Sequence, residues 1–143
     1  MSAVLDSAVV IGLLDPDDNQ HEASYSVFRE LVPPLYMHPI NLAECFVRHS
    51  HAGTISEARR DLMELGIIPE PITHRNQDSW GEAIAIAEIR AESDLKIPDA
   101  CTLGLGLKHP EAKFIAFDMR LAAKAREAGL TVITQQPEGL TAN

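Results

Sequence analysis

The sequence predicts an α/β fold with a central parallel sheet of four to five short strands. Short apolar runs alternate with helical patterns along the chain, as they do in sheets covered by helices on both faces. No internal repeat, low-complexity tract or Gly/Ser linker divides the chain, and its 143 residues are enough for one buried core. We therefore expect a single domain over residues 1–143, built as a three-layer α/β/α sandwich.

The first elements alternate as this class requires. Ala3-Val4-Leu5 has the composition of a buried strand, and the apolar residues 9–14 that follow predict a short helix. The Asp-Pro-Asp-Asp turn at 15–18 breaks that helix. Its second or third aspartate is expected to cap a helix over about residues 19–31, which Pro33-Pro34 ends.

The middle of the chain repeats the alternation. Residues 35–37 predict the second strand, and Pro39 suits the first turn of the helix after it. Thr54 and Glu57 form a capping-box pattern, which predicts a further helix that ends at Gly66. The apolar pair Ile67-Ile68 is the third strand candidate.

The last third adds three helices and two strands. An apolar pattern at Trp80, Ile84, Ala87 and Ile89 predicts a long helix from Gln77 to Ser93. The remaining elements are expected in this order: a helix from Pro98 to about Lys108, a strand over 113–117, a helix over 119–128 ended by Gly129, and a strand over 131–133.

Composition excludes several classes of protein. The net charge is −9, from 12 basic and 21 acidic residues, which argues against coating nucleic acid by bulk charge. No apolar stretch has the length of a membrane helix, and the first residues carry no basic leader, so we expect a cytoplasmic protein without membrane contact. Cys45 and Cys101 are far apart, which favours buried reduced thiols over a zinc or redox motif.

Four acidic residues stand in apolar surroundings. Asp6 and Asp118 follow two predicted strands, so both are expected at the carboxyl edge of the sheet, where α/β folds bind ligands. Glu44 and Asp99 lie near the starts of two apolar helices. Asp99 and Asp118 can also serve as helix-terminal residues, whereas Asp6 and Glu44 show no capping role. If the four converge, they require a cation, and oxygen ligands of this kind suit Mg²⁺.

At these residues the chain resembles the PIN-domain ribonucleases, most closely the VapC-type toxins of bacterial toxin–antitoxin pairs. The resemblance runs from about Val4 to Ile133. It rests on the order and spacing of four segments, which are Val4-Leu5-Asp6-Ser7, Leu42-Ala43-Glu44, Ile97-Pro98-Asp99-Ala100 and Phe117-Asp118-Met119-Arg120-Leu121-Ala122. The acidic quartet of that family maps onto Asp6, Glu44, Asp99 and Asp118.

The resemblance implies a metal-dependent endoribonuclease with a PIN-like fold. Mg²⁺ or Mn²⁺ would activate water for attack on an RNA phosphodiester. Asp6, Asp99 and Asp118 would be direct metal ligands, and Glu44 would bind directly or through water. The implied partners are a structured RNA of the tRNA or rRNA class and a cognate antitoxin protein, and the implied assembly is a homodimer.

The sequence departs from the family pattern at two hydroxyl positions, which are Ala8 and Ala116 here. Hydroxyls at such positions help to orient a carboxylate or a metal-bound water. Their loss leaves open an alternative, a non-catalytic PIN-like module that binds protein or RNA. The intact quartet favours the nuclease.

Two residues are assigned supporting roles. Ser7 is expected beside the carboxylates, where it would orient one of them. Arg120 is expected to contact a substrate phosphate, because residues 108–126 carry five basic and two acidic residues, a net charge of +3. Lys96 is a weaker candidate for the same contact. Arg48, Arg59 and Arg60 are expected to be solvated helix charges or, as the resemblance implies, part of a partner-binding surface.

Other ligand-binding classes lack their motifs. Gly104 and Gly106 fall inside a helical pattern and not in the strand-to-helix turn of a dinucleotide fold. Asp6 has no acidic neighbour of the kind that receiver domains and Asp-x-Asp phosphatases require, and no nucleophile elbow is present.

Overall fold

The computed structural model describes residues 2–74 and 78–134, and a five-stranded parallel sheet forms its centre. The strand order is β3-β2-β1-β4-β5, and all four neighbouring pairs are parallel. The predicted α/β class and all five strand positions are thereby confirmed. The strands are β1 (Ala3–Leu5), β2 (Leu35–Met37), β3 (Ile67–Pro69), β4 (Lys113–Ile115) and β5 (Thr131–Ile133).

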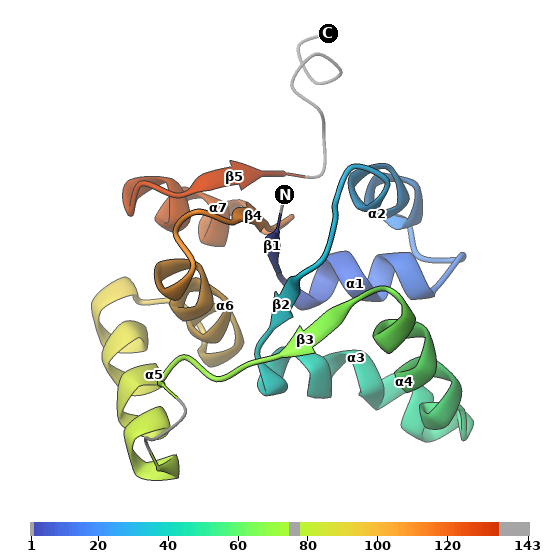
Figure 1. The fold of residues 1–143 in the computed structure, drawn as a ribbon, viewed down its shortest axis with the longest axis horizontal. Coiled ribbons are helices and arrows are strands. Elements are labelled where there is room, and N and C mark those ends of the chain that lie inside the picture. The colour runs from blue at the N-terminus through green and yellow to red at the C-terminus, as the bar shows by residue number, and fades with distance from the viewer. Residues whose placement is uncertain (1, 75–77, 135–143) are drawn as a thin grey trace, which may run out of the picture.

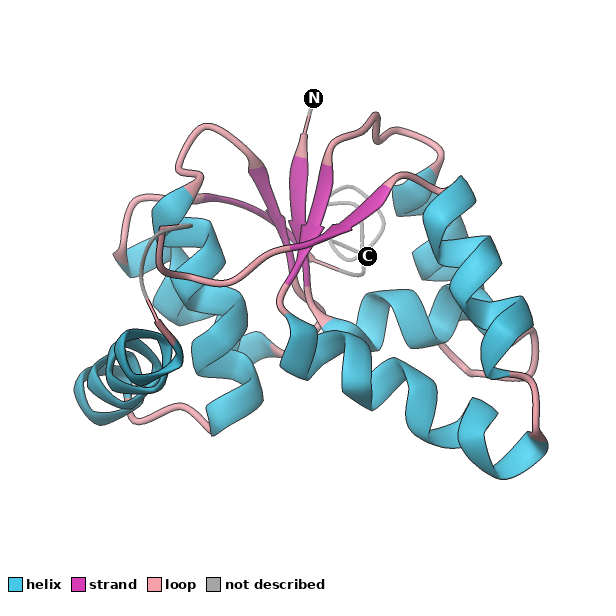
Figure 2. Ribbon diagram, turned by 60° about the horizontal axis from the view of Figure 1, so that its bottom comes forward, coloured by secondary structure: helices cyan, strands magenta, loops and turns pink. Residues whose placement is uncertain are grey.

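The described residues contain seven helices, which cover both faces of the sheet (Figures 1 and 2). One layer holds the helices of the first half of the chain, and the other holds those of the second half. The helices are α1 (Ser7–Leu14), α2 (His21–Phe28), α3 (Pro39–Ala52), α4 (Ile55–Glu64), α5 (Ser79–Ser93), α6 (Ile97–Lys108) and α7 (Met119–Glu127).

Strand alternation divides the apolar interior into two cores. Ala3 and Leu5 of β1 pack with α1, α3 and α4, whereas Val4 packs with α6 and α7. Successive side chains of a strand point to opposite faces, so β1, β2, β4 and β5 each contribute to both cores, whereas β3 contributes Ile67 to the first core only. This arrangement confirms the three-layer sandwich.

The core beside α6 depends on a close approach between helices. A Cβ atom at Gly104 would lie 2.4 Å from Cδ1 of Ile72 and 2.9 Å from Cδ1 of Ile89, on α5. Gly104 therefore permits tight packing of α5 on α6 and takes no part in a phosphate-binding turn. Cys101, one turn earlier, is a fully buried free thiol, as Cys45 is on α3.

The side-chain caps predicted for two helices are wrong. Helix α2 begins at His21 behind Gln20 and ends at Phe28, and neither Asp17 nor Asp18 caps it. Asp18 accepts a hydrogen bond from the Gln20 amide, so it stabilises the preceding turn. Thr54 precedes α4 as expected, but its hydroxyl contacts His49 Nδ1 at 3.0 Å and makes no capping bond.

Helix α5 also differs from the prediction. Its predicted first residue, Gln77, lies outside the described residues, and Asp78 caps the helix by accepting a bond from the Gly81 amide. Trp80 and Ile84 belonged to the predicted apolar pattern, but they are 79% and 56% exposed. The predicted pattern therefore does not mark the buried side of α5, and Ile89 alone of that pattern packs against the core.

The carboxyl ends of the central strands share one edge with the N-termini of three helices. Asp6 follows β1 and caps α1, His38 follows β2 and caps α3, and Asp118 stands at the start of α7. Parallel strands direct all of these residues to the same side of the sheet. No helix among the described residues is long and apolar enough to cross a membrane.

Candidate active site

Asp6 is the buried centre of the carboxyl edge. Asp6 is only 4% exposed, and its Oδ1 accepts a 2.9 Å hydrogen bond from the Ser7 amide at the start of α1. Asp6 is thus an N-cap, which corrects the expectation that it has no capping role. Burial, together with repulsion from Asp99, Glu44 and Asp118, raises the pKa of Asp6 to about 7.

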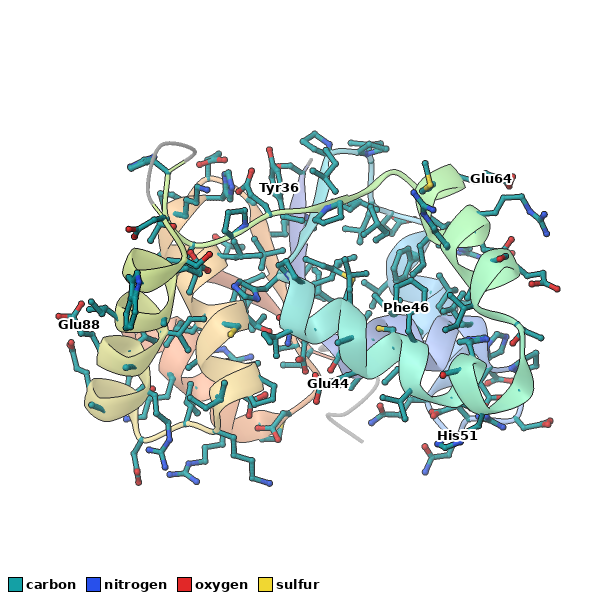
Figure 3. All side chains as sticks on the ribbon, turned by 90° about the horizontal axis from the view of Figure 1, so that it is seen from below. Tyr36, Glu44, Phe46, His51, Glu64 and Glu88 are labelled. Atoms are coloured by element: carbon teal, nitrogen blue, oxygen red, sulfur yellow. The ribbon has the colours of Figure 1, made fainter. Side chains whose placement is uncertain are left out.

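Glu44 reaches the same edge from α3 but is exposed, unlike its apolar neighbours in the sequence. Figure 3 shows it near the middle of the molecule, on the side of α3 that faces the second half of the chain. The Ser7 hydroxyl donates a 2.7 Å hydrogen bond to Glu44 Oε1. Ser7, the residue after Asp6, is therefore bonded to the carboxylate of Glu44, and its predicted role in orienting a ligand stays a prediction.

Asp99 and Asp118 complete the group from the other half of the chain. Asp99 lies in the first turn of α6 and is partly buried. Burial raises the pKa of Asp99, and the negative charges of Asp118 and Glu44 raise it further. Asp118 is exposed and caps α7, because its Oδ1 accepts hydrogen bonds from the amides of Arg120 and Leu121.

The four carboxylates are electrostatically coupled without forming a closed cage. Asp6 experiences the charge of each of the other three, and Asp99 experiences those of Asp118 and Glu44. Within residues 2–74 and 78–134, however, no three His, Cys, Asp or Glu side chains are placed to hold a metal ion as they stand.

The atoms that these four side chains offer are of the kind that a hard divalent cation binds. All donors are carboxylate oxygens, and the mutual repulsion at Asp6 is what a bound cation would relieve. Mg²⁺ binds through one or two carboxylates and keeps several waters, so it requires no protein cage. The set of direct ligands stays a prediction.

Arg120 does not extend freely toward the carboxylates. Its Nη2 donates to the backbone carbonyl of Asp94 at 3.0 Å and to Asp94 Oδ2 at 3.1 Å. Its positive charge, with that of Lys96, nevertheless lowers the pKa of Asp99, so both cations lie near the acidic edge. The predicted contact with substrate phosphate stays a prediction, but the guanidinium has a protein partner that the sequence did not indicate.

The rest of the basic segment lies elsewhere. Lys113 begins β4 and therefore stands at the amino end of the sheet. Lys108 ends α6, nine residues and about 13 Å from Asp99 along the helix axis, and it donates to the carbonyls of Pro71 and Thr73. The net charge of this segment therefore does not measure the charge beside the carboxylates.

The two departures from the family pattern differ in their surroundings. Ala116 is fully buried in the core beside α6 and α7, and its amide bonds the Ile133 carbonyl. Ala8 is half-buried on α1. At both positions a methyl group replaces the hydroxyl that would help to orient the acidic residues.

The sequence did not reveal three polar residues that support the site. Asn41 is fully buried on α3, and its Nδ2 donates to the Pro98 carbonyl at 3.0 Å, one residue before Asp99. His38 Nε2 contacts Glu82 Oε2 at 2.6 Å, while its Nδ1 accepts from the Ile40 amide. The position of His38 directly after a strand was a usable signal, whereas the partners of Asn41 and Glu82 are distant in the sequence.

Among the three residues that support the site, Glu82 carries a carboxylate whose charged form is strongly stabilised. Burial raises its pKa, but hydrogen bonds from Thr73, the Ile72 amide and His38 outweigh burial and lower the pKa to about 2. The bonds from Ile72 and Thr73 attach the segment after β3 to Glu82 on α5. The bond from His38 attaches the start of α3 to the same carboxylate. They hold in place the helix that carries Glu44.

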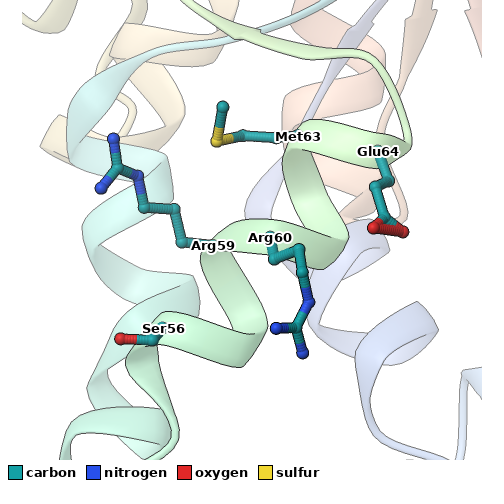
Figure 4. A pocket seen from close by; sticks show the side chains of 5 residues that line it. All are labelled: Ser56, Arg59, Arg60, Met63 and Glu64. Atoms are coloured by element: carbon teal, nitrogen blue, oxygen red, sulfur yellow. The ribbon is translucent and has the colours of Figure 1, made fainter.

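In the first half of the chain, Arg59 and Arg60 lie on α4, away from the four carboxylates, and Arg48 is paired with Asp15. Figure 4 shows a shallow hollow lined by Arg59, Arg60 and Met63 together with Ser56 and Glu64, all from α4. Arg48, one turn after Glu44, bonds Asp15. A second hollow extends from Glu44 and Arg48 toward His49 and Thr54.

The comparisons with known proteins identify the fold. No protein-family model and no curated protein matches the chain. Among solved structures, the chain is similar to a toxin–antitoxin complex from Klebsiella pneumoniae, at 18% identity and a TM-score of 0.69, over 94% of this chain and 97% of that one. It also resembles FitAcB from Neisseria gonorrhoeae, at 20% identity and a TM-score of 0.58, over 94% and 98% of the two chains.

A third similar structure is VapBC2 from Rickettsia felis bound to a DNA fragment from their promoter. It matches at 10% identity and a TM-score of 0.59, over 94% of this chain and 98% of that one. At these identities the matches show a shared fold, and they cover almost the whole of each chain. The predicted PIN-like sandwich is thereby confirmed.

Proposed function

We propose that the protein is a metal-dependent endoribonuclease and the toxin component of a toxin–antitoxin pair. The observation that carries the proposal is the meeting of Asp6, Glu44, Asp99 and Asp118, from four separate elements, at the carboxyl edge of the sheet. Buried like charges are unfavourable unless a cation or proton compensates them. A fold that places three further carboxylates within electrostatic reach of the buried Asp6 is therefore suited to divalent-cation binding.

The residues have distinct roles in this proposal. Asp6, Asp99 and Asp118 would hold Mg²⁺ or Mn²⁺ directly, and Glu44 would hold it directly or through water. When bound, the metal would supply a nucleophilic water at neutral pH and stabilise the leaving oxygen of a phosphodiester. Ser7 keeps Glu44 in one orientation through the 2.7 Å bond to Oε1, and Arg120 offers donors to a substrate phosphate.

The same edge suits the proposed partners. A structured RNA of the tRNA or rRNA class would present its phosphate to the metal, while bulk contact elsewhere is limited by the net charge of −9. A basic segment of an antitoxin would neutralise the uncovered carboxylates and thereby block the site. The folds of the toxin–antitoxin complex and of VapBC2 support this choice, and we further propose a cytoplasmic homodimer.

Two observations favour a second candidate, a PIN-like module that binds protein or RNA without catalysis. Ala116 removes a hydroxyl beside Asp118, and no closed set of three metal-binding side chains is present within residues 2–74 and 78–134. This candidate predicts no site-specific metal binding.

Calorimetric titration with Mn²⁺ separates the two candidates. We expect the wild type to bind Mn²⁺ and Asp6→Asn to bind at least tenfold more weakly. Asp61→Asn, an exposed acid on α4, is the matched control and should bind as the wild type does. Absence of binding by the wild type would contradict the nuclease.

Growth on expression gives a functional test of the same site. Wild-type protein should inhibit growth, and Asp99→Asn should relieve the inhibition at equal protein level. Inhibition by Asp99→Asn as strong as that by the wild type would show that the assigned site is wrong.

A further inference from the structure

The turn between α5 and α6 lies beside the carboxylates and carries an unusual residue. Asp94 ends α5 in the left-handed region, at φ 61°, where most residues other than glycine and asparagine are strained. Its carbonyl and its carboxylate both accept from Arg120 Nη2, and its Oδ1 accepts from Arg90 Nη1 at 3.2 Å. Asp94 is thus placed between two arginines.

The turn is fixed to the body of the protein on both sides of Asp94. Leu95 is 1% exposed and belongs to the core beside α6. The Ser93 hydroxyl donates to the Ile89 carbonyl and accepts from the Leu95 amide, and the Asp94 amide bonds the Arg90 carbonyl. The acceptors that Asp94 presents to Arg120 are therefore held in place.

Arg120 is also fixed at its backbone. Its amide donates to Asp118 Oδ1 at 2.9 Å, so its main chain is attached to one of the four carboxylates. Its side chain is 62% exposed, and within residues 2–74 and 78–134 no partner bonds its Nε or Nη1. A guanidinium has five N–H donors, so this one keeps donors for a ligand while Asp94 holds it.

The cations are distributed unequally around the edge. On the α6 and α7 side, Arg120 and Lys96 are both exposed and both act electrostatically on Asp99. On the α1 and α3 side, Arg48 is paired with Asp15, as Arg120 is with Asp94. The two sides therefore differ by Lys96, which no hydrogen bond or ion pair holds within residues 2–74 and 78–134. An approaching polyanion therefore meets available positive charge on the α6 and α7 side of the carboxylates.

We propose that Asp94 is a positioning residue, which holds Arg120 beside Lys96 as a binding site for an RNA phosphate next to the one that is cleaved. This inference rests on the proposed nuclease and specifies which side of the site the RNA backbone follows. Holding a guanidinium in advance reduces the entropy lost when it binds phosphate. The cost of an acidic residue near RNA is offset by the fixed geometry of the arginine.

Cleavage of end-labelled unfractionated tRNA with Mn²⁺ tests the site. Arg120→Ala should raise KM about tenfold, leave kcat within about threefold, and reduce the slope of log KM against log salt by about one unit. Arg120→Lys should recover part of the loss. Arg126→Ala removes an exposed arginine from the last turn of the same helix and should change KM less than twofold.

Two neutral variants at residue 94 test the positioning role. Asp94→Asn keeps an acceptor oxygen and tolerates φ 61°, whereas Asp94→Gly suits the backbone but removes the side-chain acceptor. We expect Asp94→Gly to raise KM about three- to fivefold, the range of an exposed charged contact, and Asp94→Asn to stay near wild type. Asp94→Gly should have no further effect in Arg120→Ala, because the contact is already absent.

The outcomes distinguish the inference from the proposed function. If charge alone mattered, both neutral variants would lower KM equally, and that result would overturn the positioning role. Wild-type cleavage with an unchanged KM in Arg120→Ala would overturn the phosphate site alone. A wild type without Mn²⁺-dependent cleavage of tRNA or rRNA would contradict the proposed nuclease and the inference together.

Discussion

Asn41 on α3 donates a 3.0 Å hydrogen bond to the carbonyl of Pro98 on α6, and this bond joins the helix of Glu44 to the helix of Asp99. The two helices belong to opposite layers of the sandwich and meet at the carboxyl edge. The Pro98 carbonyl also accepts from the Thr102 hydroxyl at 3.3 Å. The separation of the two acidic residues is thus set by a buried amide that is not itself a proposed ligand.

Replacing this amide should weaken both the fold and the site. Asn41→Ala is expected to lower the free energy of unfolding by about 1–3 kcal/mol, because a buried hydrogen bond is lost and a space is left. Mn²⁺ affinity should fall as well, since the hydrogen bond that fixes α3 relative to the start of α6 is lost. Urea unfolding and calorimetry measure the two effects. The exposed Asn19→Ala is the control, and unchanged metal affinity in a destabilised Asn41→Ala would contradict the link.

Ser7 gives a more local test of carboxylate orientation. Ser7→Ala removes the 2.7 Å bond to Glu44 Oε1 and should lower Mn²⁺ affinity about tenfold, as is common for residues that orient metal ligands. Its unfolding free energy should change by less than about 1.5 kcal/mol. Ser50→Ala, an exposed serine on α3, should leave affinity unchanged. Equal affinities in the three proteins would show that Ser7 does not orient a ligand.

The buried Asp6 makes the metal-free protein less stable as the pH rises from about 4 to about 7. Its pKa is about 7 when folded, above the ordinary 3.8, so the unfavourable charge costs nothing below pH 3.8 and reaches its full cost above about pH 7. Asp6→Asn should therefore raise the free energy of unfolding in EDTA at pH 8 by about 2–4 kcal/mol. At pH 4 the difference should nearly vanish. A variant less stable than the wild type at pH 8 in EDTA would contradict this assignment.

Glu82 has the opposite pH dependence. Its pKa is about 2 when folded, below the ordinary 4.5, so its stabilisation is fully present above pH 4.5 and is lost as the pH falls toward 2. Its side chain is 18% exposed, and Glu82→Gln should cost about 2–3 kcal/mol at pH 7. Urea unfolding should show this difference shrinking at pH 3. Glu88→Gln, on the exposed face of the same helix, should cost little at either pH.

The strands and the four acidic residues were predictable because their signals are local. A three-residue apolar run followed by Asp6 identifies both a strand and its end. The fourth strand ends at Ile115 and not at Phe117 as predicted, so Asp118 marks the start of α7 and not the end of β4. Parallel topology then brings the strand ends together. Glu44 was identified by its apolar neighbours, although the structure shows that the residue itself is exposed.

The remaining features depend on partners that are distant in the chain. The apolar spacing in α5 includes Trp80, but packing against Gly104 and Ile72 determines which side of the helix is buried. Arg120 is separated from Asp94 by 26 residues, and Asn41 from Pro98 by 57. Capping predictions failed where another group competed, as His49 does for the Thr54 hydroxyl.

The order of the carboxylates along the chain has a consequence for synthesis on the ribosome. Asp6 and Glu44 emerge first, and their companions Asp99 and Asp118 emerge only after α4, β3 and α5 have been made. The central strand β1 likewise pairs with β4, which is translated late. A nascent or truncated chain that ends before Asp118 therefore cannot assemble the edge, and any activity of this site begins only after Asp118 has been synthesised.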